Sequence, residues 1–460
     1  MGNYGCSLIN LLYLPFCLSI FDPNHRLLDN RFDDVEMSRQ YDDESTLVNS
    51  FRRVLTKKRV TIICSVVFSL LVVIGVTVTG ILVSRAKNVV SFKSSLENHV
   101  KSDFKSIDPE LMASYVDELT SLYEDRQISS DHVLEFEVML NFDQFNKDHN
   151  RVHASHNERK DRFLTFRTKF LKVKIHQGHE TYSREINSFA DMTEEEFNKL
   201  FPPIKVPESK STTSHVDRLM ARMVSDETYL KNLKKALNTD KDVDPKNITG
   251  EGLDWRKADG VSKIKNQGLE CGSCWAFASV SSVESLYKIY RNVTLDLSEQ
   301  ELVDCETSSK GCEGGFGDTA LKYIQNKGVS TDSEIPYLGK KNNCLVKSID
   351  KTYINYFTIA YGQDVLKKSL VISPTIVYIA ASNDLSMYQA GVYNGECGSA
   401  LNHAVLLVGE GYDEVLDKRY WVIKNSWGPD WGEDGYLRLE RTNKGEDKCG
   451  ILSVGITPGF

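Results

Sequence analysis

The stretch from Val60 to Ser84, VTIICSVVFSLLVVIGVTVTGILVS, contains no charged residue and divides the chain into a short N-terminal part and a long C-terminal part. At about 1.5 Å per residue, a helix of this length reaches past the roughly 30 Å hydrocarbon core of a bilayer. A helix buried in a protein core would be unusual at this length without a polar face. We therefore predict a single transmembrane signal anchor at residues 60–84.

Basic residues flank this stretch unequally. Those before it are more numerous than the two that follow it closely, Arg85 and Lys87. Because cytosolic flanks carry the excess of positive charge, residues 1–59 are predicted to be a cytosolic tail. The chain after residue 84 is then lumenal or extracellular, which makes this a type II membrane protein. The upstream basic residues are Arg52, Arg53, Lys57, Lys58 and Arg59.

Three features of the N-terminus leave alternatives open. Residues 8–21, LINLLYLPFCLSIF, resemble the apolar region of a signal peptide, but no Lys or Arg precedes them. Gly2 and Cys6 would suit dual acylation, although the usual Ser or Thr at the sixth position is missing. Met37 would also serve as a start, in which case residues 1–36 are an artefact of the gene model.

Cysteines concentrate in the last part of the chain. Cys6, Cys17 and Cys64 lie early, and all the others follow residue 270. In an oxidising compartment six of these later cysteines can pair, and one must remain a thiol or pair outside the chain. The odd number therefore indicates a reactive cysteine. The later cysteines are Cys271, Cys274, Cys305, Cys312, Cys344, Cys397 and Cys449.

Overall charge excludes one class of partner. The chain has 56 Lys and Arg residues against 64 Asp and Glu residues, a formal net charge of -8. A protein that follows the phosphates of nucleic acid needs a basic surface, so we expect no nucleic acid partner.

The lumenal chain changes character twice. Residues 90–200 are rich in charged helix formers with apolar residues at helical spacing, as in ERKDRFLTFRTKFLKVKI. Residues 202–246 contain more Pro, Ser, Thr and Asp, which predicts an exposed segment with at most one helix, open to proteolysis. After Asn247 the sequence becomes rich in Gly, Tyr, Trp and Cys.

This last region predicts helices first and strands second. CWAFASVSSVESLYKIY has the apolar spacing of an amphipathic helix that begins near Cys274, and Ser298 with Glu301 forms a capping box for another helix. TIVYIAA, HAVLLVGEG, RYWVIKNSWG and GYLRLER are short runs of β-branched and aromatic residues, typical of strands. We therefore expect an α+β fold with a cleft where the two halves meet.

The pair Cys271 and Cys274 in ECGSCWAF could be a zinc half-site, a redox pair, or a structural cysteine beside a nucleophile. Zinc is disfavoured because no second Cys or His pair has a suitable spacing. A redox pair is disfavoured because it would sit in a small βαβ unit, not in a domain with five further cysteines. A nucleophile fits best, because a thiol in the first turn of a helix is stabilised as a thiolate.

A thiolate also needs a group that handles the proton. His403 is the only histidine after Asn247. A neutral imidazole needs an orienting acceptor, and Asn425 in KNSWG can provide one, while Trp427 could keep water from that hydrogen bond.

Four motifs in this order, NQGLECGSCWAF, GCEGG, LNHAV and KNSWGPDWGEDGY, resemble the papain family of cysteine proteases over residues 252–460. The resemblance implies that Cys274 is the nucleophile, His403 the base and then the acid, and Asn425 the residue that orients it. Gln267 and the backbone N–H of Cys274 would form the oxyanion hole. The family usually has one residue fewer between Gln267 and the nucleophile, which puts the placement of Gln267 in question.

The resemblance also implies a two-lobed fold with a helical N-terminal lobe and a β-barrel-like C-terminal lobe. No metal or organic cofactor is expected. Gly314 and Gly315 would hydrogen-bond an extended peptide substrate, and Trp427 would border the site. The implied disulfides are Cys271 with Cys312, Cys305 with Cys344, and Cys397 with Cys449. The residues that would line the main specificity pocket are Phe316, Tyr378, Leu401, Ala404 and Val454, which predicts an apolar residue at substrate position P2.

Upstream, the chain resembles the inhibitory prosegment of these proteases. Glu158, Arg162 and Phe166 match the first three positions of its helical motif, and Asn187, Phe189 and Asp191 match a second motif. Four residues depart from the two motifs: Lys169, Val173, Gln177 and Glu185. We therefore predict a propeptide and linker at residues 85–246 and a peptidase domain at residues 247–460.

An anchor ahead of such a prosegment resembles the falcipain-like proteases of apicomplexan parasites, although the long hairpin of some of those enzymes is missing between Tyr412 and Tyr420. The predicted function is a membrane-anchored zymogen of a thiol endopeptidase that acts on proteins or peptides and is inhibited by its own propeptide. The alternative is a tethered papain-like protein that binds peptides without cutting them.

Two further expectations concern the compartment. Asn247 and Asn292 begin the sequons NIT and NVT, acceptors for glycosylation in a lumenal chain. Charging of histidines near pH 5–6 would loosen the prosegment in an acidic, lysosome-like compartment, unless they are merely solvated surface residues. These histidines are His132, His149, His153, His156, His176, His179 and His215.

Overall fold

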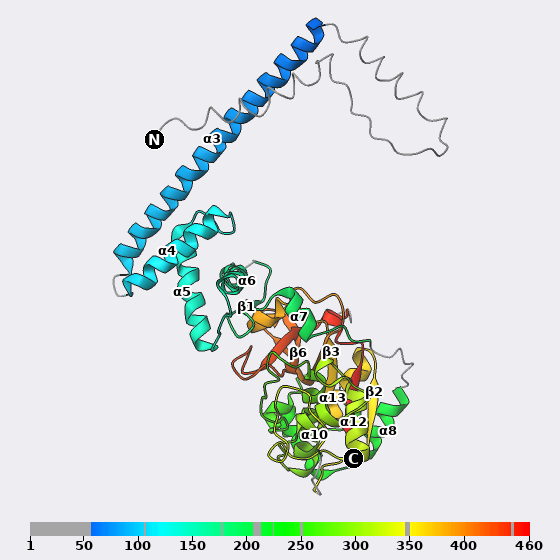
Figure 1. Cartoon of the computed structure of the whole chain (residues 1–460). Coiled ribbons are helices and arrows are strands. Elements are labelled where there is room, and N and C mark those ends of the chain that lie inside the picture. Colours follow the sequence, from blue (N-terminus) through cyan, green and yellow to red (C-terminus); the bar gives the residue numbers. More distant parts are fainter. Residues whose placement is uncertain are drawn as a thin grey trace, which may run out of the picture. The chain divides into compact units, whose positions relative to one another are not determined.

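The computed structural model describes residues 57–104, 107–175, 178–205, 213–223, 225–248, 252–345, 350–442 and 446–460. The chain divides into two compact units, residues 1–90 and 91–460. Helix α3 (Lys57–Asp103) forms the described part of the first unit and continues into the second (Figure 1). It contains one stretch long and apolar enough to cross a membrane by length and composition. The helix extends well beyond Ser84, where the predicted anchor ends.

Three helices follow, α4 (Pro109–Glu124), α5 (His132–Asp148) and α6 (His156–Lys174). Each begins where a side chain accepts a hydrogen bond from the first turn: Asp108, Asp131 and Ser155 respectively. Together with the end of α3 they enclose a core of their own, rich in aromatic rings such as Phe142, Phe163 and Phe166. We call this part the helical unit.

Residues 178–205 leave the helical unit and pack on the region after residue 252. Strand β1 (Tyr182–Arg184) pairs antiparallel with β4 (Tyr388–Tyr393), and helix α7 (Glu194–Leu200) begins with a complete capping box of Thr193 and Glu196. The apolar side chains of this segment, including Phe189, Phe197 and Phe201, belong to the large core that also contains Cys274. We call residues 178–205 the crossing segment.

The expectation of an exposed linker at residues 202–246 is wrong. Two helices lie there, α8 (Thr213–Met223) and α9 (Glu227–Ala236). Their apolar faces are buried in the large core because Val216, Leu219, Tyr229 and Leu233 recur at helical spacing. The interrupted, polar composition of the segment hid this spacing.

The last region begins with the helices α10 (Cys274–Arg291), α11 (Glu299–Cys305) and α12 (Gly317–Lys327). Helix α10 begins at Cys274 as predicted, but it is not amphipathic: every residue from Cys274 to Leu286 is buried, because α11, α12 and β5 contact it. Ser298 caps α11 as expected, yet the carboxylate of Glu301 accepts hydrogen bonds from Ser330 and Tyr323. The predicted capping box is therefore only half formed.

Eight strands form one sheet in the order β1-β4-β7-β6-β5-β3-β8-β2. The four runs predicted as strands are confirmed as β3, β5, β6 and β7. Helix α13 (Gln363–Ile372) and strand β2 interrupt the predicted order of helices before strands. The strands after β1 are β2 (Tyr356–Ala360), β3 (Thr375–Ile379), β4 (Tyr388–Tyr393), β5 (His403–Asp413), β6 (Lys418–Lys424), β7 (Tyr436–Glu440) and β8 (Gly455–Gly459).

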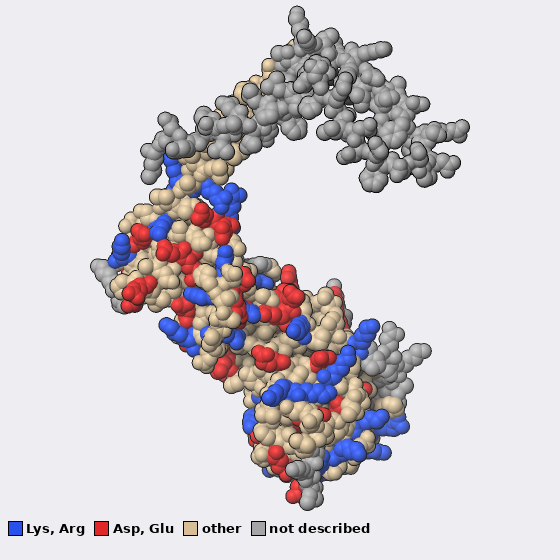
Figure 2. Space-filling model, viewed as in Figure 1, with Lys and Arg blue, Asp and Glu red and all other residues tan. Residues whose placement is uncertain are grey.

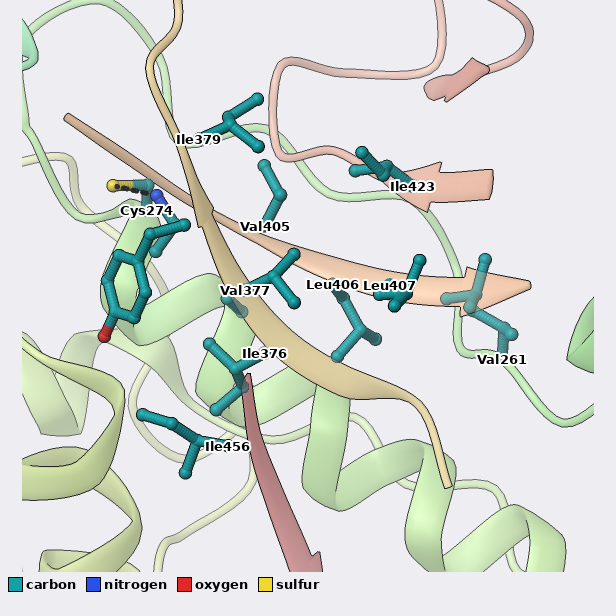
Figure 3. Close-up of a cluster of buried hydrophobic side chains, with 14 of the residues drawn as sticks. Val261, Cys274, Ile376, Val377, Ile379, Val405, Leu406, Leu407, Ile423 and Ile456 are labelled. Atoms are coloured by element: carbon teal, nitrogen blue, oxygen red, sulfur yellow. Dashed lines mark hydrogen bonds between the residues drawn. The ribbon is translucent and has the colours of Figure 1, made fainter. Parts of the chain in front are cut away.

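Acidic and basic side chains both lie on the visible face of the second unit, and basic side chains form a band across its lower part (Figure 2). Inside, the apolar side chains of β3, β5 and β8 meet those of α10 in the large core. Cys274 borders this cluster beside residues such as Val377 and Val405 (Figure 3). The first residue of α10 and the first residue of β5 are thereby brought to one place.

Candidate active site

Cys274 occupies the first position of α10 and is 4% exposed. The backbone N–H of Ala404 donates a hydrogen bond to its Sγ at 3.4 Å, drawn as a dashed line in Figure 3. The preceding turn is held in place because the N–H of Gly272 donates to the carbonyl of Cys312 at 2.8 Å. The sulfur therefore lies at the positive end of α10 and next to the residue that follows His403.

His403 begins β5, and its side chain is oriented by the loop after β6. Nε2 lies 2.7 Å from Oδ1 of Asn425, which also accepts the backbone N–H of Ser426 at 2.8 Å. Nδ1 has no hydrogen-bond partner among the described residues. Because Asn425 occupies Nε2, Nδ1 is the ring nitrogen left for exchange of a proton with a neighbouring group.

Trp427 stacks on the imidazole of His403 with ring centroids 4.8 Å apart and an angle of 22°. It is 4% exposed and so covers one face of the ring. The structure thus brings Cys274, His403, Asn425 and Trp427 together, although they come from three separate elements of the chain.

Gln267 also joins this group, and it is followed by a turn at Gly268, whose φ is 73°. The backbone N–H of Gln267 donates to the carbonyl of Ser426, and its Oε1 accepts from Ser426 Oγ at 2.8 Å. Its Nε2 donates to the carbonyl of Cys271 at 3.1 Å. The amide is therefore fixed at the Cys271–Cys274 turn.

Tyr337 supports the same turn from outside. Its hydroxyl donates to the backbone carbonyl of Gln267 at 2.9 Å and lies 2.6 Å from Oγ of Ser273. Sequence reasoning missed both Tyr337 and Ser426. Ser426 lies within the KNSWG motif and could have been found there, whereas Tyr337 is one of 20 tyrosines with no local feature that marks it.

Burial sets the electrostatics of the two reactive side chains. Loss of solvent raises the pKa of the Cys274 thiol to about 11, against the opposing effect of backbone N–H groups. Loss of solvent also lowers the pKa of His403 to about 4, although the hydrogen bond to Asn425 favours the charged form. In this state, thiol and imidazole are both neutral between pH 5 and 7. The sequence predicted a thiolate at Cys274, and burial disfavours this charged form while the site is covered.

The crossing segment contributes to the burial of His403. The ring of Phe201 meets His403 edge-on with centroids 5.0 Å apart, and Phe189 packs on Trp427 at 4.9 Å. The backbone N–H of Ile204 donates to the carbonyl of Leu401 at 2.6 Å. No sequence feature singled out Phe201, because its contact with His403 joins residues about two hundred positions apart.

Gly314 and Gly315 lie opposite this segment. Gly314 has a φ of 105°, and an added Cβ would lie 3.7 Å from Pro202. At Gly315 a Cβ would lie 2.5 Å from the ring of Trp275, so a side chain would be excluded by packing. Of the two predicted peptide-binding glycines, Gly314 therefore lies against the crossing segment, whereas Gly315 packs on Trp275.

The five residues predicted for the specificity pocket are only partly linked by contacts. Tyr378 and Ala404 are paired across β3 and β5, and the Tyr378 hydroxyl accepts the N–H of Gly317, next to Phe316. Leu401 contacts Ile204 through its backbone, and Val454 immediately precedes β8. None of the five lines the cavity of about 850 Å³ between α6, α7 and residues 381–402.

Three disulfides link Cys271 with Cys312, Cys305 with Cys344 and Cys397 with Cys449, the same pairs that the resemblance implied. Cys274 is free and buried. Asn247 and Asn292 are both exposed, and Asn292 Oδ1 accepts from Asn232. Within the described ranges, no three His, Cys, Asp or Glu side chains gather in a way that could hold a metal ion.

Comparison with known proteins gives matches to both halves of this arrangement. The family model for papain family cysteine proteases matches residues 249–458, and the model for the cathepsin propeptide inhibitor domain matches residues 142–197. A cysteine proteinase of Theileria parva is 44% identical over 95% of this chain and 98% of its own length. Falcipain-2a of Plasmodium falciparum is 34% identical over 72% of this chain and 67% of its own length. Among solved structures, a stem bromelain precursor matches with a TM-score of 0.58 and 30% identity, covering 70% of this chain and 99% of the precursor.

Proposed function

Because this chain belongs to the papain family of cysteine proteases and carries the inhibitory propeptide of that family, we propose that Cys274, His403 and Asn425 form its catalytic site. In the proposed reaction, the Cys274 thiolate attacks a peptide carbonyl and forms a thioester, while His403 gives its proton to the leaving amine. Water then hydrolyses the thioester, with His403 as the base.

The observation that carries this proposal is that one ring nitrogen of His403 is held by Asn425 and the other is left without a partner, close to Cys274. Oδ1 of Asn425 lies 2.7 Å from Nε2 of His403, and Nδ1 has no partner among the described residues. The backbone N–H of Ala404, the next residue, donates to Sγ of Cys274. The amide of Gln267 and the backbone N–H of Cys274 are the proposed donors to the oxyanion. At present Gln267 Nε2 is bonded to the carbonyl of Cys271, so it would reorient when substrate binds.

The zymogen is proposed to be latent for a second reason besides steric cover. With the crossing segment in place, the pKa of Cys274 is about 11 and that of His403 about 4, so the reactive ion pair does not form. Removal of the segment would readmit water to both groups. The two pKa values would then move in opposite directions, and the ion pair would become accessible.

Labelling with an irreversible epoxide that reacts with thiolates tests the site directly. We expect stoichiometric labelling of Cys274 in the activated enzyme and none in Cys274→Ala, which should retain the fold and lose at least about a thousandfold in turnover. Peptide hydrolysis retained by Cys274→Ala would refute the assignment. Peptide binding without labelling or cleavage by the native chain would instead support the alternative of a non-cleaving peptide-binding protein.

We further propose a preference for Leu, Val or Phe at P2, since Phe316, Tyr378, Leu401, Ala404 and Val454 are all apolar or aromatic. A series of fluorogenic dipeptides that differ only at P2 should show the highest kcat/KM for these residues. Fastest cleavage with Arg or Glu at P2 would contradict the pocket assignment.

Maturation is proposed to cut between Lys205 and Thr213, upstream of the predicted boundary at residue 247. The reason is that α9 is fixed to the peptidase region: Tyr229 donates to the carbonyl of Val371 at 3.0 Å and Asn232 to that of Ile289 at 2.8 Å. Removing α8 and α9 would expose the apolar surface of the peptidase region on which their buried faces pack. N-terminal sequencing of the mature enzyme should find a first residue before Thr213, and a start near residue 247 would rule this out.

Before maturation, the chain is proposed to be a type II membrane protein anchored through residues 60–84, with its peptidase region in a lumenal, acidic compartment. The apolar part of α3 and the unequal basic flanks support this topology. Asn247 and Asn292 are then available for glycans. In sealed microsomes, added protease should spare the peptidase region, and degradation of that region without detergent would reverse the orientation.

A further inference from the structure

One edge of the sheet is formed by a strand that maturation removes. β1 pairs with β4 in antiparallel register, with Tyr182 opposite Gly391 and Arg184 opposite Tyr388. The backbone N–H of Val392 donates to the carbonyl of Thr181 at 2.8 Å, and the N–H of Glu185 donates to the carbonyl of Met387 at 2.9 Å. On its other side β4 pairs with β7. Without β1, the strand β4 becomes an edge with unpaired backbone groups.

Beside this edge lies Asp384, a carboxylate whose side chain is 5% exposed. The crossing segment and α6 supply most of its partners: Arg184 Nε and Lys172 Nζ each lie 2.8 Å away, and the Tyr182 hydroxyl 2.6 Å away. The partner that remains after maturation is the hydroxyl of Tyr393, at 3.2 Å. Cleavage thus leaves an acidic group that has lost two cations.

Beside Asp384, the ring of Tyr182 occupies a narrow space bordered by Tyr393 and Gly395, which we call the aromatic slot. The ring of Tyr182 lies 4.5 Å from that of Tyr393, and an added Cβ at Gly395 would lie 2.4 Å from the Tyr182 hydroxyl. At Gly391, a Cβ would lie 2.4 Å from the carbonyl oxygen of Thr181. These two glycines let a strand and its ring approach closely, and the slot ends at Asp384.

We propose that the activated enzyme uses this edge, formed by Asp384, Tyr388, Gly391, Tyr393 and Gly395, to dock an extended segment of its protein substrates. The segment would add to β4 as a strand and carry an aromatic residue followed two positions later by Arg or Lys. The proposal rests on the proposed function, since it requires that maturation removes the crossing segment.

Two physical arguments select this occupant. Alternate side chains of a strand share a face, so an aromatic residue and a basic residue two positions apart can reach the slot and Asp384 together, as Tyr182 and Arg184 do. The Arg184 guanidinium lies over the Tyr182 ring, 4.7 Å from its centroid, so a basic residue two positions after an aromatic residue gains from both the carboxylate and that aromatic face. An acidic or purely apolar segment would leave the buried carboxylate without a counter-charge.

Direct binding tests the docking edge with the catalytic cleft blocked. The activated enzyme is first labelled on Cys274 with the epoxide, and fluorescent Gly-Thr-Tyr-Ser-Arg-Gly is then titrated by anisotropy. We expect the peptide in which Arg is replaced by Ala, and the peptide in which Tyr is replaced by Ala, each to bind about tenfold more weakly. Equal binding of all three peptides would overturn the proposal, and this comparison needs no altered enzyme.

Enzyme variants locate the peptide. Asp384→Asn should weaken binding of the native peptide about tenfold, while Asp364→Asn, which removes an exposed carboxylate on α13, should not change it. Cleavage then connects docking to function: a fluorogenic apolar-P2 sequence is joined to the peptide through a Gly-Ser linker. The linked substrate should show a severalfold lower KM than its Arg-to-Ala form, with kcat unchanged.

The outcomes separate the two proposals. If neither the short nor the linked substrate is cleaved and Cys274 is not labelled, the catalytic assignment fails. If the short substrate is cleaved normally but the linked peptide gives no advantage, and Asp384→Asn binds as the native enzyme does, only the docking edge is refuted.

Discussion

The match to the propeptide inhibitor domain, residues 142–197, includes α6 of the helical unit and most of the crossing segment, but these two parts are held together in different ways. The helical unit buries its aromatic side chains against one another, as Phe166 does against Phe142 at 5.3 Å and Phe145 at 5.2 Å. The crossing segment buries its rings against the peptidase, as Phe201 does against His403 and Trp427. The first has its own core, whereas the second has none without the enzyme.

The difference separates stability from inhibition. We therefore expect the helical unit to remain folded while its contacts with the peptidase change, and the crossing segment to be ordered only while it is bound. Several polar links join the two parts. Arg151 donates to Ser188 and Asp191, and the two Nη atoms of Arg162 on α6 each lie 2.5 Å from the carboxylate of Glu196. Lys169, a departure from the family motif, donates to the carbonyl of Phe189 and to Asn383 of the peptidase. Inhibition therefore depends on the helical unit, on the crossing segment that covers the active site, and on the polar links between them.

The largest effect is expected from a substitution in the core of the helical unit. Phe166→Ala should destabilise the helical unit by about 3–5 kcal/mol, because it leaves a cavity among rings that are fully buried. Thermal unfolding of the Cys274→Ala proenzyme measures this. Val133→Ala, at a side chain 46% exposed, is the control and should change stability by less than about 0.5 kcal/mol. An equally small effect of Phe166→Ala would mean that the helical unit has no core of its own.

Removing an aromatic ring of the crossing segment from the active site should affect the reactivity of Cys274 more than the stability of the protein. Phe201→Ala removes the ring that covers His403, so water reaches Cys274 and the pKa of its thiol falls from about 11. Alkylation of the uncut chain by iodoacetamide at pH 7.5 should become at least about tenfold faster. Phe201→Leu, which keeps apolar cover, should stay close to the native rate. No acceleration in the Ala variant would show that burial by Phe201 does not hold the thiol protonated.

Weakening the link between the two parts should have a moderate effect. Glu196→Gln leaves Arg162 with a neutral partner, and we expect maturation to become roughly threefold to tenfold faster. The hydrogen bonds from Arg162 hold the pKa of Glu196 at about 2, below its ordinary value. Stability from this pair is therefore present above the unfolded pKa near 4.3 and is lost only as pH falls toward about 2. Between pH 7 and 5, the variant should keep the native pH dependence of maturation, and loss of that dependence would make Glu196 the acid trigger.

The smallest effect concerns His149, at the end of α5. Burial, helped by nearby Arg151, lowers its pKa below the ordinary value. A base with a lowered folded pKa binds its proton more readily when unfolded, so its contribution to stability is lost as pH falls below about 6.5. His149→Gln should thus move the midpoint of acid maturation to slightly lower pH. An unchanged midpoint would leave the acid-release hypothesis without support from this residue, and His176 lies outside the described residues.

Much of the catalytic region could be predicted from the sequence because its signals are local. A helix start at Cys274 and the strands containing His403 and Val422 depend on spacing and residue type within a few positions. Four motifs in order gave the family and the disulfide pairs. The same local reasoning failed at α10, where a helix predicted to have one polar face is buried on all sides, because burial depends on what packs around a helix.

Other features were decided only by the tertiary structure. These features all join residues far apart in the chain. They are the packing of α8 and α9 in the large core, the contact of Phe201 with His403, the hydrogen bond from Tyr337 to Gln267, and the grouping of Arg184 and Lys172 at Asp384. The sequence by itself determined which elements form and which residue types can carry out thiol chemistry, because hydrogen bonding and side-chain period act over one or two turns. It did not determine which side chains remove water from the site, because desolvation is set by whatever surfaces meet there after the chain has folded.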